Sequence, residues 1–223
     1  MKNLLDIDDH YIKYPKDEWG GTDLNNHDMV NPFIEIQKIV NPKKVIEIGM
    51  WAGHSALLMM TVFKNLQSLV SYDPHPVSER NAKQIKKFWP QHTYYKDAIW
   101  DNEDRHSDID LIFVDGCHAE DHPTRDLHSA IKIKTRYILV DNLEHENVSF
   151  PCRRMFRLYN VKHEPKFWFY TNTKYSTVKE GVTTSPGIMG LFKIEPEDFV
   201  RISPPRRVSD VVSIESFYHY EPS

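Results

Sequence analysis

The apolar residues of this chain fall into short continuous runs that alternate with longer amphipathic stretches. A continuous apolar run of about four to eight residues is typical of a buried strand, and apolar residues at helical spacing are typical of a surface helix. Capping rules place one helix start at Asn31-Pro32 and another at Ser78. We expect strands at 44–48, 68–72, 92–96, 109–114 and 137–140, and helices at 31–40, 55–63, 78–88, 120–133 and 152–159.

The pattern changes after residue 160. Two apolar runs, 166–171 and 188–194, are joined by a polar loop rich in Thr and Ser, which is typical of an antiparallel pair. Alternating strands and helices followed by such a pair predict an α/β fold: a Rossmann-like, doubly wound, mostly parallel sheet of seven strands whose last pair is antiparallel. We expect one domain at 31–195, between an N-terminal arm at 1–30 and a C-terminal tail at 196–223.

The segment 45–55, VIEIGMWAGHS, combines the end of a strand, two glycines and the start of a helix. Gly49 lets the chain turn sharply and lets a ligand approach bare backbone. The free N–H groups at the start of the next helix favour an anionic or polar ligand. A tight strand–helix turn without a ligand would need the same glycines, so the loop alone does not establish a site.

Acids follow four of the five expected parallel strands, at Asp73, Asp97, Asp115 and Asp141. Ligands in doubly wound sheets bind beyond the carboxyl ends of the strands. We therefore expect these acids to converge on one edge of the sheet, beside the glycine loop.

Composition narrows the function further. The chain has 223 residues and a net charge of −4, which argues against a nucleic-acid binder driven by bulk charge. Its two cysteines indicate no disulfide framework. The N-terminus shows no apolar signal core and no apolar run could span a bilayer, so we expect a cytoplasmic protein with no membrane contact. The oligomeric state stays open, with a homodimer among the options.

The pattern Glu47-x-Gly49-x-x-x-Gly53-x-Ser55 resembles motif I of the class I S-adenosylmethionine-dependent methyltransferases. Asp73 lies where that family has an acid on the ribose hydroxyls, 24 residues after Gly49, near the spacing of about 20 residues in dinucleotide-binding folds. Asp97 is similar to the acid of the turn near the adenine. The resemblance implies S-adenosylmethionine as cofactor, bound by Glu47, Gly49, Met50, Trp51, Gly53, Ser55, Asp73, Asp97 and Asp115.

The segment 110–118, DLIFVDGCH, is similar to the DGxH signature of a small-molecule methyltransferase subfamily. Metal-dependent O-methyltransferases of the catechol, caffeoyl-CoA and macrolide-sugar types have a metal-binding acid after strand four and Asp-Asn or Asp-Asp after strand five. The resemblance implies that Asp115, Asp141 and Asn142 hold Mg²⁺, which prefers oxygen ligands. It also implies that His118, three residues after the first acid, is the general base. A small, polar, sugar-like molecule with a hydroxyl group is the expected acceptor.

Each of these residues also has a purely structural interpretation. Asp141-Asn142 could form a strand-end turn, Asp115 could pair with a helix N-terminus, and His118 could be a hydrogen-bonded structural histidine. His118 and His122 share the spacing of a zinc pair, but the order HAEDH followed by Pro123 argues against zinc. Three other functions stay open: a metal-independent N- or carboxyl-methyltransferase, a NAD-dependent oxidoreductase, and a non-catalytic cofactor-binding module.

Overall fold

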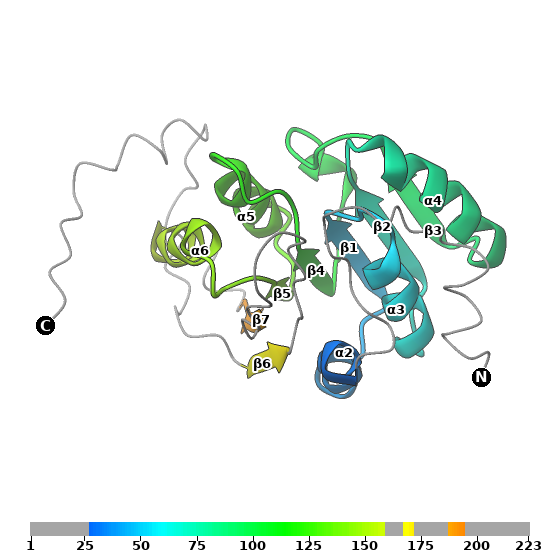
Figure 1. The fold of residues 1–223 in the computed structure, drawn as a ribbon, viewed down its shortest axis with the longest axis horizontal. Helices are drawn as coiled ribbons and strands as arrows, with labels where there is room; N and C mark the ends of the chain where they lie inside the picture. The colour runs from blue at the N-terminus through cyan, green and yellow to red at the C-terminus, as the bar shows by residue number, and fades with distance from the viewer. Residues whose placement is uncertain (1–26, 159–166, 172–186, 195–223) are drawn as a thin grey trace, which may run out of the picture.

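The core of the fold is one mixed sheet. A computed structural model describes residues 27–158, 167–171 and 187–194, with seven strands in the order β3-β2-β1-β4-β5-β7-β6 (Figure 1). The first five strands are parallel, and β7 runs antiparallel to both of its neighbours. The predicted Rossmann-like fold class is confirmed. The strands are β1 (Lys44–Ile48), β2 (Ser68–Tyr72), β3 (His92–Tyr95), β4 (Leu111–Val114), β5 (Tyr137–Val140), β6 (Phe167–Thr171) and β7 (Gly187–Lys193).

Helices cover both faces of this sheet (Figure 1). On one face, the apolar sides of α2, α3 and α4 pack against alternate strand residues such as Val45 and Leu111. On the other face, α5 and α6 pack against the intervening residues, such as Ile46 and Ile112. This alternation follows from the period-two geometry of a strand. The helices are α2 (His27–Ile39), α3 (His54–Val62), α4 (Pro76–Phe88), α5 (His122–Lys132) and α6 (Glu146–Leu158), with a short η1 (Glu103–Arg105) before β4.

Three helix starts differ from the sequence-based prediction. Helix α2 begins at His27 and contains Pro32, and α6 begins at Glu146 and contains Pro151. A proline inside a helix removes one backbone hydrogen bond, but burial of the apolar face of the helix offsets this cost. In α4 the N-cap is His75, whose Nδ1 accepts the Val77 N–H at 3.2 Å. The predicted starts at Asn31, Ser78 and residue 152 were therefore wrong.

The predicted arm and tail lie outside the described residues, except for residues 27–30 at the start of α2. None of the helices in the described part of the chain is long and apolar enough to cross a membrane.

Candidate functional site

The parallel strands end in register, and this places the predicted turn residues side by side. The Gly49 N–H donates to Tyr72 O at 2.9 Å, and the Asp115 N–H donates to Ile48 O at 2.9 Å. The Asp73 and Asp141 N–H groups continue the same ladder, to Tyr95 O and Val114 O, both at 3.1 Å. The carboxyl edge of the sheet therefore brings together the glycine loop and three of the four predicted acids.

The glycine loop follows β1 with backbone that only glycine adopts easily. Gly49 has a φ of +89°, and a Cβ atom there would lie 1.9 Å from the carbonyl oxygen of Asp115. Gly53 has a φ of +87° and is the N-cap of α3, where no side chain caps the helix. The loop is thus pressed against the turn after β4, and it leads into the N-terminal, positive end of the α3 helix dipole.

Asp73 connects this loop to the turn after β2. Its two carboxylate oxygens accept the backbone N–H groups of Trp51 at 2.6 Å and His75 at 2.7 Å. The Tyr94 hydroxyl donates to the Asp73 carbonyl oxygen at 2.5 Å. The carboxylate is therefore held in one orientation, and each of its oxygens keeps a second lone pair that can accept a hydrogen bond from a ligand hydroxyl. This geometry suits the ribose contact that the sequence predicts.

Two other motif residues, Glu47 and Met50, hold the glycine loop through their buried side chains. Glu47 is fully buried and accepts hydrogen bonds from the Ser55 and Ser71 hydroxyls. The Met50 side chain is 2% exposed and belongs to the core. These two side chains shape the loop. Trp51 is partly exposed, and its ring lies against that of His75, with 4.4 Å between the ring centroids.

Burial of Glu47 makes a pH-dependent stability measurable. Burial raises the pKa of Glu47 from 4.5 to about 7, against the lowering effect of its two serine partners. The folded protein then keeps a proton that the unfolded chain releases, so the free energy of unfolding falls as the pH rises from 4.5 to about 7. We expect Glu47→Gln to flatten this fall by up to about 3 kcal/mol. Urea unfolding of both proteins across this pH range measures the free energy of unfolding at each pH. If it falls equally with pH in both proteins, the pKa of Glu47 is not raised.

Asp115 and Asp141 form a half-buried acidic pair directly after the adjacent strands β4 and β5. Burial raises the pKa of Asp115 well above its ordinary value, and the nearby Asp141 carboxylate raises it further. Burial also raises the pKa of Asp141 to about 7, and Glu144 adds to this shift. Such a concentration of carboxylates is stabilised by a divalent cation, which removes the repulsion between them.

The acidic pair and His118 line one small hollow of about 10 Å³, close to the size of a single water molecule or ion. Burial lowers the pKa of His118, and His145, whose ring centroid lies 5.8 Å away, lowers it further. At neutral pH the imidazole is therefore neutral and can accept a proton. The structure thus brings together Asp115, Asp141 and His118, as the sequence predicts.

Asn142 has a different geometry from its two predicted partners. It adopts a φ of 57°, its N–H donates to Asp141 Oδ1 at 2.8 Å, and its side-chain amide lies 3.5 Å from Glu144 Oε1. Asp97 is exposed and accepts the Ala98 N–H at 2.9 Å within its own loop. Neither side chain is held toward the acidic pair by these contacts, so their assignment as metal and cofactor ligands remains a prediction.

Two further acids belong to this region and were not assigned from the sequence. Glu144 accepts the Ile188 N–H of β7 at 2.8 Å and raises the pKa values of Asp115 and Asp141. Asp126, from α5, lines the hollow and accepts the Trp100 indole N–H at 2.8 Å. The sequence shows that Asp126 follows the DGCH segment, but whether its side chain points toward the hollow depends on how α5 packs.

Glu120, Asp121 and His122 form a separate group whose ligand atoms lie within 4.8 Å of one another. Asp121 is paired with Arg125 at 2.7 Å, and the His122 ring lies against Trp100. His118, the other histidine of the HAEDH sequence, belongs to the hollow instead. A zinc site that uses both histidines therefore has no support in this arrangement.

Residues 46–143 match the family described as a methyltransferase domain. This segment runs from β1 to the turn after β5, and it contains the glycine loop, Asp73 and the acidic pair. No curated protein matches the chain by sequence.

Solved structures share the fold at low identity. A methyltransferase of Podospora anserina with bound S-adenosylhomocysteine has a TM-score of 0.60 and 12% identity, covering 86% of this chain and 88% of that chain. An O-methyltransferase of Bacillus cereus, also with S-adenosylhomocysteine, has a TM-score of 0.54 and 15% identity, covering 85% and 96%. A precorrin 8w decarboxylase of Methanobacterium thermoautotrophicum has a TM-score of 0.58 and 15% identity, covering 83% and 98%. At these identities the likeness establishes the fold alone.

Proposed function

We propose that this chain, a class I S-adenosylmethionine-dependent methyltransferase, transfers the methyl group to a hydroxyl oxygen of a small polar molecule. The observation that carries the proposal is the meeting of Asp115, Asp141 and His118 in one hollow next to the glycine loop. A hydroxyl is a weak nucleophile at neutral pH. A metal ion held by carboxylates can polarise it, and a neutral imidazole can accept its proton.

The methyl donor supplies an electrophilic carbon on a positively charged sulfur, which leaves as a neutral thioether. On our proposal, the loop backbone at Gly49 and the start of α3 hold this donor, and Asp73 accepts hydrogen bonds from its ribose hydroxyls. The fixed position of the Asp73 carboxylate supports this role, because a preorganised acceptor loses little entropy on binding. Alignment of donor and acceptor then supplies much of the rate enhancement.

The acidic pair fits Mg²⁺, which binds one or two carboxylates and keeps water or substrate oxygens as its remaining ligands. When bound there, the ion would polarise the acceptor hydroxyl and lower its pKa. Asp115 and Asp141 would hold it, with Asn142 as a further ligand. His118, which lines the same hollow, would then take the hydroxyl proton at a ring nitrogen.

An acceptor screen tests the proposal. The full chain is incubated with methyl-labelled S-adenosylmethionine and a panel of sugars, catechols, amines and carboxylic acids, with Mg²⁺ or with a chelator. We expect methylation of a hydroxylated member that stops with the chelator. Methylation of amines or carboxylates that ignores the chelator would contradict the proposal and support a metal-independent enzyme.

The pH dependence isolates the role of His118. We expect kcat/KM to rise with pH along an acidic limb whose apparent pKa lies below about 6.5, because the lowered pKa of His118 sets the fraction of free base. In His118→Asn this limb should disappear and kcat should fall by about 10²–10⁴-fold. An unchanged limb in the variant would remove His118 from the reaction. Equal binding of S-adenosylhomocysteine by both proteins controls for folding.

A further inference from the structure

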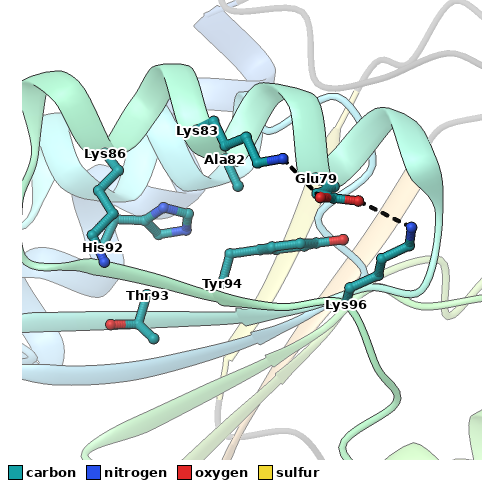
Figure 2. A pocket seen from close by; sticks show the side chains of 8 residues that line it. All are labelled: Glu79, Ala82, Lys83, Lys86, His92, Thr93, Tyr94 and Lys96. Atoms are coloured by element: carbon teal, nitrogen blue, oxygen red, sulfur yellow. Dashed lines mark hydrogen bonds and ion pairs between the residues drawn. The ribbon is translucent and has the colours of Figure 1, made fainter.

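A second hollow lies between α4 and the edge strand β3, apart from the acidic pair. Its volume is about 350 Å³, within the size range of small-molecule sites. Figure 2 shows side chains from α4 and from β3 with its following residue arranged around it. Those that matter here are Glu79, Lys83, Lys86, His92, Tyr94 and Lys96.

The charges around this hollow are unbalanced. Three lysines and one carboxylate line it. Glu79 pairs with Lys83 at 2.7 Å and with Lys96 at 3.0 Å, and these contacts lower its pKa to about 2. Lys86 has no ion-pair partner in the described part of the chain. The surplus of positive charge favours an anionic ligand.

His92 adds a specific requirement for a hydrogen-bond donor. Its side chain has no exposed surface, and its Nε2 lies 3.0 Å from the Ser71 hydroxyl. At pH 8, where Glu47 is ionised and can only accept, the Ser71 hydroxyl donates to Glu47 and accepts from His92, so Nε2 carries the hydrogen. Nδ1 is then a bare acceptor, and no described group donates to it. Burial, together with Lys86, lowers the pKa of His92 to about 4, so the ring stays neutral.

A buried acceptor without a partner is unusual in a folded protein, and it indicates an absent ligand or water. In Figure 2 the imidazole extends from β3 into the space below α4, beside the flexible stem of Lys86. Because His92 has no exposed surface, a ligand reaches Nδ1 only when a neighbouring side chain such as that of the exposed Lys86 moves. The Tyr94 hydroxyl already donates to Asp73 O, so Tyr94 offers a ligand the apolar face of its ring, against which a carbon skeleton can pack.

We propose that this hollow binds a small phosphomonoester, whose phosphate oxygens contact Lys86 and Lys83 and whose carbon-bound hydroxyl donates to His92 Nδ1. A phosphomonoester combines the required negative charge and donor in one molecule. The glycine loop also attracts anions, and the test must therefore separate the two places.

Titration calorimetry of the full chain with glycerol 3-phosphate, at pH 8 and with saturating S-adenosylhomocysteine, provides the first test. We expect binding that Lys86→Met weakens at least tenfold. Lys87→Met is the matched control, because Lys87 is exposed on the same helix, contacts Gln84 at 2.8 Å and does not line the hollow. Equal weakening by both variants would indicate diffuse attraction and overturn the site. Absence of binding, or binding that S-adenosylhomocysteine abolishes, would overturn it as well.

The histidine contact has its own readout. In ¹⁵N spectra of histidine-labelled protein, the Nδ1 signal of His92 should shift with glycerol 3-phosphate, and should not shift with sulfate, which carries no donor at pH 8. His92→Gln identifies the signal by its loss. An unmoved signal, or the same shift with sulfate, would contradict the hydrogen bond. This site does not depend on the methyl acceptor, so its failure would leave the proposed O-methylation intact.

Discussion

Gly49→Ala should abolish binding of S-adenosylhomocysteine and destabilise the fold. The new Cβ would lie 1.9 Å from Asp115 O, 2.5 Å from Asp115 C and 2.8 Å from Gly116 Cα. These are backbone atoms held by the β1–β4 ladder, so no side-chain rotation relieves the overlap. The positive φ adds about 1–2 kcal/mol of strain for any residue with a Cβ. We expect a total loss of at least about 3 kcal/mol by urea unfolding, at the upper end for single substitutions.

Gly53→Ala is the matched control for this prediction. Gly53 has nearly the same φ, +87°, but its Cβ would meet only the ends of two flexible side chains, Ile85 and Met50, each at 2.8 Å. The strain is shared by both variants, and the backbone overlap belongs to Gly49 alone. Gly53→Ala should therefore keep measurable affinity and lose less stability. Equal losses in calorimetry and unfolding would show that the approach of Gly49 to the β4 turn does not matter.

Asp141→Asn should lower kcat by about 10²–10³-fold, the usual effect of losing one preorganised electrostatic group at a reaction centre. The same change should make the metal-free protein more stable at pH 8, because it removes a carboxylate charge that repels the Asp115 carboxylate and raises the pKa of Asp115. A variant with lower activity and higher stability indicates that the acid serves the reaction although its charge, repelled by a neighbouring carboxylate, destabilises the fold. Thermal unfolding with a chelator and steady-state kinetics with Mg²⁺ measure the two effects.

Asp104→Asn provides the control, because Asp104 is exposed in η1 and does not line the hollow. It should change neither the melting temperature nor kcat. If Asp141→Asn keeps full activity, the acidic pair has no part in the reaction. If it destabilises the metal-free protein, the Asp141 carboxylate supports the fold, and the repulsion between the two acids is not the dominant effect.

Much of the fold could be predicted because its strands are short, apolar and end in acids or glycine. The run before Gly49 and the run before Asp141 end where the structure ends β1 and β5. Parallel pairing then places those ends on one edge without further information. The starts of α2 and α6 were harder to predict, because the preference of proline for the first turn of a helix does not account for tertiary packing. Pro32 and Pro151 lie inside helices whose neighbouring residues, such as Ile36 and Cys152, are buried in the core.

The site was predictable where it follows the strand ends, and not where it depends on packing. Asp115 and Asp141 could be placed from the sequence because β4 and β5 are adjacent. Glu144 lies near the site because its loop is hydrogen-bonded to β7, and Asp126 lies there because of how α5 packs. Neither position follows from a periodic pattern in the sequence. The Ser71–His92 contact likewise joins residues 21 positions apart on neighbouring strands.

Binding of Mn²⁺, a spectroscopic substitute for Mg²⁺, tests the central claim most directly because it needs no knowledge of the acceptor. Electron paramagnetic resonance counts the ions bound to the full chain with saturating S-adenosylhomocysteine, in the unchanged protein, Asp141→Asn and Asp104→Asn. We expect one bound ion in the unchanged protein and in Asp104→Asn, displaced by Mg²⁺, and none in Asp141→Asn at the same concentration. An unchanged protein that binds no ion, or an Asp141→Asn protein that binds it equally well, would contradict the metal-assisted mechanism.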